Sequence, residues 1–116
     1  MAKILISPFS INKAWRGRRY KTKEYSDWRK EFSYLMLPRR SKMLYNESLT
    51  LDVVFGLKYP KKCDLDNLIK PFLDACVENG LIKDDRQITE IIAKKWATNK
   101  LLKENVEYIN FNFFVN

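Results

Sequence analysis

The sequence predicts an α+β fold: a single small domain with a mixed β-sheet and two main helices, in the order β-α-β-α-β-β. Three observations support this prediction. The chain has 116 residues, enough to bury one hydrophobic core. Apolar residues alternate with polar ones in some segments and recur every three or four positions in others. No repeat or linker divides the chain, so we treat residues 1–116 as one domain.

The first helix is predicted at residues 22–37, after a short strand at 3–7 and a basic loop at 8–21. Thr22 is a suitable N-cap, and Pro38 cannot continue the helix. The apolar side chains of this segment are spaced three or four apart and form one stripe that faces the core: Tyr25, Trp28, Phe32 and Leu35.

A second strand and a second helix follow. In residues 49–59 an apolar side chain stands at every second position, which predicts a strand with one buried face. Residues 67–79 predict a helix, and Asn79 with Gly80 is typical of a helix C-terminus. Pro71 falls inside this helix, so either the regular helix begins late or its first turn is distorted. The side chains predicted to be buried are Leu68, Phe72, Leu73, Cys76 and Val77.

Residues 88–97 and 105–115 predict the last two strands, joined as a hairpin around residues 99–100. The apolar phase of the last strand changes at residues 108–109. This change indicates either a bulge or burial of both faces.

The chain contains no histidine, which excludes Ser-His-Asp and Cys-His catalysis and imidazole zinc sites. Catalysis would have to use carboxylates, lysine, tyrosine, thiols or a metal bound by oxygen. Cys63 and Cys76 have no metal-site spacing and no disulfide framework, which favours a reducing cytoplasm. No apolar run approaches the roughly 18 residues of a membrane span, so no membrane association is expected.

The positive charge of the chain is concentrated near its start. The net charge is +8; residues 1–42 hold 12 basic and 3 acidic side chains, whereas residues 43–116 hold 10 and 11. Such a basic block favours a polyanionic partner, because each Lys or Arg beside a phosphate releases a counterion. The alternative is an ordinary solvated basic face.

An acidic cluster follows the second strand. In extended backbone Asp64 and Asp66 point to one side, and Asp66 or Asn67 is expected to cap the second helix. Lys70 lies one turn after Asp66, and the return of the chain after the helix allows Asp85 to reach the same place. Carboxylate oxygens that converge in this way are the ligands that Mg²⁺ requires.

Each of these residues also has an ordinary structural interpretation. Asp64 and Asp66 can be helix caps, Lys70 a surface lysine, and Asp84 with Asp85 a solvated turn. Two further acids lie on the helix face of Asp66 and Lys70 and are expected to be solvated: Asp74 and Glu78.

These motifs resemble the RusA family of Holliday-junction resolvases. The resemblance is carried by Asp64-Leu65-Asp66-Asn67-Leu68-Ile69-Lys70, Leu73-Asp74-Ala75, Gly80 and Asp84-Asp85-Arg86-Gln87-Ile88. The opening segment is similar as well, through Pro8, Ser10, Asn12, Trp15-Arg16, Thr22, Glu24-Tyr25 and Trp28.

The resemblance implies a homodimeric, Mg²⁺-dependent endonuclease that makes paired nicks in four-way DNA junctions during recombination and repair. Mn²⁺ is expected to substitute for Mg²⁺, and no small-molecule cofactor is expected. By position, Asp64, Asp66 and Asp85 are the metal-binding catalytic carboxylates, Lys70 is the catalytic lysine, and Asp84 is the neighbouring acid.

The candidate DNA-binding residues are basic side chains near the start of the chain and before the acidic cluster: Arg16, Arg18, Arg19, Lys21, Arg39, Arg40, Lys61 and Lys62. Two alternatives remain open from the sequence. One is a non-catalytic basic module that binds branched DNA, and the other is a basic adaptor that binds another protein.

Overall fold

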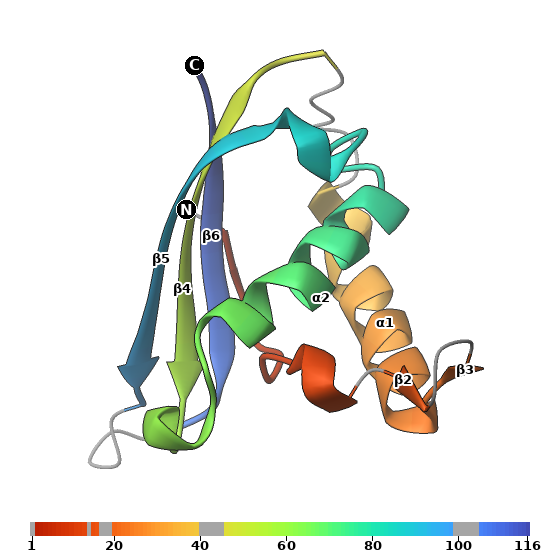
Figure 1. The fold of residues 1–116 in the computed structure, drawn as a ribbon, viewed down its shortest axis with the longest axis vertical. Helices are drawn as coiled ribbons and strands as arrows, with labels where there is room; N and C mark the ends of the chain where they lie inside the picture. Colours follow the sequence, from red (N-terminus) through yellow and green to blue (C-terminus); the bar gives the residue numbers. More distant parts are fainter. Residues whose placement is uncertain (1, 14, 17–19, 40–45, 99–104) are drawn as a thin grey trace.

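The computed structural model describes residues 2–13, 15–16, 20–39, 46–98 and 105–116. Within these residues the main elements follow the predicted order, which confirms the α+β class (Figure 1). They are β1 (Ala2–Ile4), α1 (Lys23–Met36), β4 (Leu49–Leu57), α2 (Asp66–Glu78), β5 (Ile88–Ala97) and β6 (Tyr108–Val115). Short elements complete them: β2 (Trp15–Arg16), β3 (Tyr20–Lys21), and the 3₁₀ turns η1 (Ile11–Lys13), η2 (Leu37–Arg39), η3 (Pro60–Lys62) and η4 (Asp85–Gln87). No helix within the described residues is long and apolar enough to cross a membrane.

The four-stranded sheet has the strand order β1-β6-β4-β5. Strand β4 pairs in parallel with β5, through the crossover helix α2, and antiparallel with β6. The predicted hairpin between β5 and β6 is therefore wrong, because β4 lies between them. The error has a physical cause: alternation of side chains identifies a strand but not its partner, and β6 gains two hydrogen-bonded neighbours by pairing with β1 and β4.

The core lies between the sheet and the two helices, which both cover one side of it (Figure 1). Phe72 of α2 stands at its centre. Its ring centroid lies 6.0 Å from that of Phe32 on α1, 6.2 Å from Phe55 on β4 and 5.1 Å from Phe111 on β6. These edge-to-face contacts join both helices to the sheet and fix α2 across it.

Strand β4 is buried more completely than its alternation predicts. Thr50 and Val54 on its outer face, away from the helices, are as protected as core residues. The register of β4 with β6 runs without a bulge, so the predicted bulge does not occur here, and the outer face of β6 is partly buried over residues 108–112. Tyr108 lies on the outer face directly over Gly56, where an added Cβ would approach the ring to 2.1 Å. Gly56 therefore makes room for this ring.

Helix α1 begins at the predicted cap. Thr22 Oγ1 accepts the Tyr25 N–H at 3.2 Å and donates to the carbonyl oxygen of Lys13 at 2.6 Å. The buried stripe is Tyr25, Trp28, Phe32 and Met36, whereas the predicted Leu35 is only partly buried. Strand β1 is shorter than predicted and ends at Ile4, although Ser7 beyond it accepts the Trp28 indole N–H at 2.7 Å.

Replacing Thr22 with Ala is expected to lower the free energy of unfolding by about 1 kcal/mol. The reason is that the hydroxyl makes two hydrogen bonds, one at the start of α1 and one to the preceding loop. Urea denaturation followed by circular dichroism measures the change. Thr22→Ser keeps the hydroxyl and is the control, so equal destabilisation by both variants would contradict the assigned cap.

Helix α2 starts at Asp66 and runs through Pro71, so the late start considered from the sequence does not occur. The predicted capping by Asp66 or Asn67 is wrong: the N-cap residue is Leu65, in helical conformation and without a side-chain hydrogen bond. The predicted C-terminus is confirmed. Gly80 has a φ of 71°, which glycine tolerates, and its N–H bonds the Val77 carbonyl at 3.0 Å. Beyond it Leu81 bonds back to Cys76 at 3.0 Å, and Val77 is partly rather than fully buried.

The two cysteines differ in environment. Burial raises the pKa of the Cys76 thiol well above its ordinary value, whereas Cys63 is partly exposed. We expect iodoacetamide to modify Cys63 in the folded protein and Cys76 only after denaturation, as measured by peptide mass spectrometry. Equal modification rates without denaturant would contradict the packing of α2.

Candidate active site

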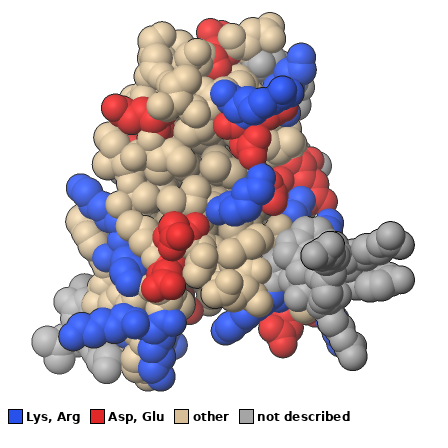
Figure 2. Space-filling model, viewed as in Figure 1, with Lys and Arg blue, Asp and Glu red and all other residues tan. Residues whose placement is uncertain are grey.

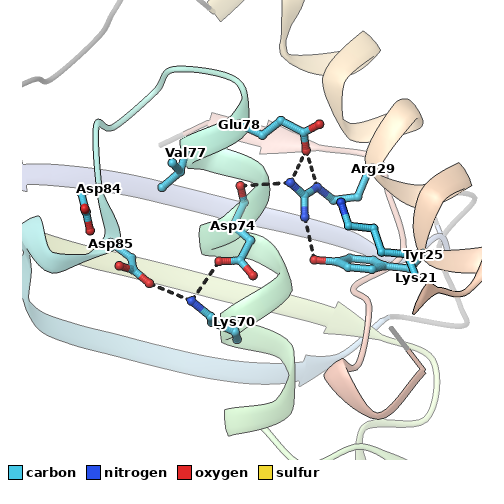
Figure 3. A pocket seen from close by; sticks show the side chains of 9 residues that line it. All are labelled: Lys21, Tyr25, Arg29, Lys70, Asp74, Val77, Glu78, Asp84 and Asp85. Atoms are coloured by element: carbon cyan, nitrogen blue, oxygen red, sulfur yellow. Dashed lines mark hydrogen bonds and ion pairs between the residues drawn. The ribbon is translucent and has the colours of Figure 1, made fainter. Parts of the chain in front are cut away.

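A hollow of about 480 Å³ opens to solvent between α1, α2 and the segment before β5 (Figure 3). Three cations, from β3, α1 and α2, and four acids, from α2 and the start of η4, meet around it, together with one aromatic ring and one aliphatic side chain. Its walls are formed by Lys21, Tyr25, Arg29, Lys70, Asp74, Val77, Glu78, Asp84 and Asp85.

Lys70 forms part of the wall of this hollow, on the second turn of α2. Its Nζ lies 2.8 Å from Asp85 Oδ2 and 3.0 Å from Asp74 Oδ1 (Figure 3). These hydrogen bonds, first to Asp85 and then to Asp74, raise the pKa of Lys70 above its ordinary value. The side chain is 54% exposed, so the ammonium stays charged and accessible to a ligand.

Turn η4 presents Asp85 to Lys70. Asp84 is the N-cap of this turn; its carboxylate accepts the Arg86 N–H at 2.9 Å, and Gln87 Oε1 accepts the Asp84 N–H at 3.1 Å. The Arg86 guanidinium also bonds Asp84 and holds the pKa of that carboxyl well below its usual range. Asp84 thus stabilises the turn, whereas Asp85 contacts the lysine.

A second network beside Lys70 joins the two helices. Arg29 of α1 donates to the Tyr25 hydroxyl at 2.7 Å, forms an ion pair with Glu78, and bonds the Asp74 carbonyl oxygen at 3.4 Å (Figure 3). Burial raises the pKa of Tyr25, so its hydroxyl keeps its proton and accepts this bond. The network was not anticipated, since Asp74 and Glu78 were expected to be solvated. The spacing of Lys70, Asp74 and Glu78 by four residues was the available signal.

Asp64 and Asp66 flank the partly buried Leu65 at the start of α2, and both are exposed. Figure 2 shows acidic side chains gathered over the start of α2, separated from those further along the helix by a basic side chain. The described residues contain no group of three His, Cys, Asp or Glu side chains placed to hold a metal ion. The expected convergence of Asp64, Asp66 and Asp85 is therefore not seen in this arrangement, where Asp85 pairs with Lys70 instead.

The donor chemistry nevertheless suits a hard cation. The three expected ligands are carboxylates, and Asp64 and Asp66 are exposed and belong to no ion pair found among the described residues. Asp66 lies one helical turn before Lys70, and Asp85 contacts that lysine. Asp66 and Asp85 are thus both neighbours of Lys70, one along α2 and one from η4, and Asp64 lies two residues before Asp66. Oxygen is the ligand atom that all three would offer.

The candidate DNA-binding residues are distributed over several elements. Lys21 lines the hollow, and Lys61 and Lys62 are exposed on η3, with Lys62 Nζ 4.8 Å from the Tyr59 ring centroid. Arg16 lies in β2 and Arg39 ends η2. Three further candidates fall outside the described residues: Arg18, Arg19 and Arg40.

Comparison with known proteins relates the chain to one nuclease family. The family described as "Endodeoxyribonuclease RusA" matches residues 9–106, a span that includes both helices and every acid discussed above. A relative of similar size is the crossover junction endodeoxyribonuclease rusA of Enterobacteria phage HK97. It is 26% identical over 91 residues, which cover 76% of each protein. This match over most of the chain establishes that the protein belongs to the RusA family of endodeoxyribonucleases.

Proposed function

We propose that this protein is a divalent-metal-dependent endonuclease that resolves four-way DNA junctions by hydrolysing phosphodiester bonds. The observation that carries the proposal is the contact of Lys70 with Asp85 and Asp74, inside the region that matches a nuclease family. A charged ammonium among carboxylates in an open hollow suits an anionic substrate that arrives together with a cation.

In this proposal Asp64, Asp66 and Asp85 are the metal ligands, and Mg²⁺ is the physiological ion, with Mn²⁺ as a substitute. When bound, such an ion polarises a phosphoryl oxygen and lowers the pKa of a coordinated water. The all-carboxylate donor set supports Mg²⁺ over softer metals.

Lys70 is proposed to contact the scissile phosphate. Asp85 and Asp74 both bind its ammonium in this structure, and the proposal is that substrate displaces Asp85 while Asp74, on the same helix, stays beside the lysine. Release of Asp85 would leave Lys70 held by Asp74 and directed toward the negative charge that develops on the phosphate. The Arg29 network fixes α1 against α2 at this point and so holds the hollow in shape.

The DNA strands are proposed to follow exposed basic side chains, among them Lys21 at the hollow and Lys61 and Lys62 on η3. Contacts of this kind bind the phosphates and position the DNA, but they do not distinguish one base sequence from another. We further propose a homodimer, because a two-fold arrangement of sites matches the two symmetric strands that a four-way junction presents. Action in the cytoplasm is proposed because both cysteines are free thiols.

The experiment is cleavage of a labelled four-way junction and of a linear duplex of the same sequence, in Mg²⁺, Mn²⁺ or EDTA. We expect paired nicks in the junction with either metal and none in EDTA. Salt-sensitive binding of the junction without nicks would favour the non-catalytic DNA-binding module, and absence of binding to any DNA would favour the protein adaptor.

A further inference from the structure

Lys95 of β5 has a charged side chain on the sheet face that carries the core. It pairs in register with Phe55 of β4, on the side facing the helices, where Ile91 and Ala93 precede it. Its Nζ donates to two backbone carbonyl oxygens, that of Pro60 at 2.8 Å and that of Cys63 at 2.7 Å. No carboxylate among the described residues forms an ion pair with Lys95.

These two carbonyls belong to the segment that carries the first two acids. We call residues 60–66 the carboxylate loop; it leads from β4 to α2 and contains Asp64 and Asp66. Outside α2, the other backbone hydrogen bonds found here among the described residues join positions three apart, such as Cys63 N–H to the Pro60 carbonyl at 3.4 Å. Lys95 thus adds the contact that ties the loop to the sheet.

The hydrogen bond from Lys95 to the Cys63 carbonyl is the one closest to the acids of the loop. The Cys63 carbonyl belongs to the planar peptide group that joins Cys63 to Asp64, so this bond restrains the backbone immediately before Asp64. A hydrogen bond from a charged donor is about twice as strong as one between neutral groups. Leu65, packed against the core, fixes the loop from the other side of Asp64.

We propose that Lys95 is a positioning residue, which fixes the carboxylate loop so that Asp64 and Asp66 are oriented to bind a divalent cation. The inference rests on the proposed function in so far as these two acids are metal ligands. Lys95 itself touches neither substrate nor ion. Its effect is to restrict the rotation of the loop before the ion arrives, which removes an ordering cost from binding.

The test compares Lys95→Met, which keeps the aliphatic stem but removes the donors, with Lys95→Arg, which retains a cationic donor. Lys94→Met is the matched control, because Lys94 lies on the outer face of the same strand with its Nζ 5.9 Å from the Trp96 ring centroid. Four quantities are measured: Mg²⁺ affinity by calorimetry, amide hydrogen exchange of residues 60–66, kcat and KM for junction cleavage, and the melting temperature.

We expect Lys95→Met to weaken Mg²⁺ binding on the order of 10- to 100-fold, the range found for groups that orient metal ligands. Exchange in residues 60–66 should become faster, and kcat at a fixed low Mg²⁺ concentration should fall while KM for the junction stays the same. High Mg²⁺ should restore kcat. Lys95→Arg should recover most of the affinity, and Lys94→Met should match the wild type.

Unchanged Mg²⁺ affinity and unchanged exchange in Lys95→Met would overturn the inference, as would a lower melting temperature with no change in either quantity. If Lys95→Met does not fold, Lys95→Gln replaces it and is judged by the same two quantities. A wild-type protein that binds Mg²⁺ but cuts no junction would overturn the proposed function instead, while exchange and calorimetry would still decide the role of Lys95.

Discussion

Replacing Lys70 with Met is expected to lower the single-turnover rate of junction cleavage by a factor on the order of 10²–10³, the usual cost of removing one preorganised charge from a transition state. Lys70 is exposed at the surface of α2, so the fold does not depend on it. Junction affinity measured in EDTA should therefore change little, because one cation among many contributes to binding the DNA backbone.

The matched control for this variant is Lys83→Met, which removes an exposed cation from the segment between α2 and η4 and breaks no ion pair with Asp74 or Asp85. Its cleavage rate should equal that of the wild type. A Lys70→Met protein that cleaves as fast as Lys83→Met would exclude the lysine from the chemistry.

Replacing Asp66 with Asn is expected to remove Mg²⁺ binding and to lower the cleavage rate by about 10² or more, because loss of a metal ligand costs more than loss of a group that only orients one. Asp66 makes no capping hydrogen bond at the start of α2. Asparagine has the same size, so the melting temperature should stay within a few degrees of the wild type.

Asp27→Asn is the control for Asp66→Asn, since it removes an exposed carboxylate from α1 by the same isosteric change. Calorimetry with Mg²⁺ and cleavage of the labelled junction are compared for both. Full activity in Asp66→Asn would rule this residue out as a ligand, whereas equal losses in both variants would indicate a general effect of charge.

The elements of the fold could be predicted where one segment of sequence determines them. Thr22 and the apolar stripe define α1, and Gly80 ends α2 because its backbone conformation requires glycine. Partner choice in the sheet could not be predicted in this way. The alternation in residues 105–115 is compatible with pairing to β5 or to β4, whereas the observed order depends on contacts between distant segments, such as the pairing of β6 with β1 and the packing of Phe111 against Phe72.

The candidate site, like the fold, could be predicted only in part from the sequence. Lys70 and Asp85 were predicted to lie near each other, and they are in contact. Asp74, the second partner of Lys70, was expected to be solvated. The neighbouring ion pair of Arg29 with Glu78 was missed, because each looks like an ordinary solvated residue on its own helix. Lys95 was missed for a related reason: its function depends on backbone carbonyls, which no residue pattern reveals.

The location of the bound ion tests the account most directly. Crystals of the protein soaked with Mn²⁺, in complex with a junction, would place the ion by its anomalous scattering. We predict one peak within bonding distance of the carboxylates of Asp64, Asp66 and Asp85, with the Lys70 ammonium released from Asp85. A peak bound elsewhere, with Asp85 still paired to Lys70 and Asp64 in solvent, would contradict the proposed catalytic centre.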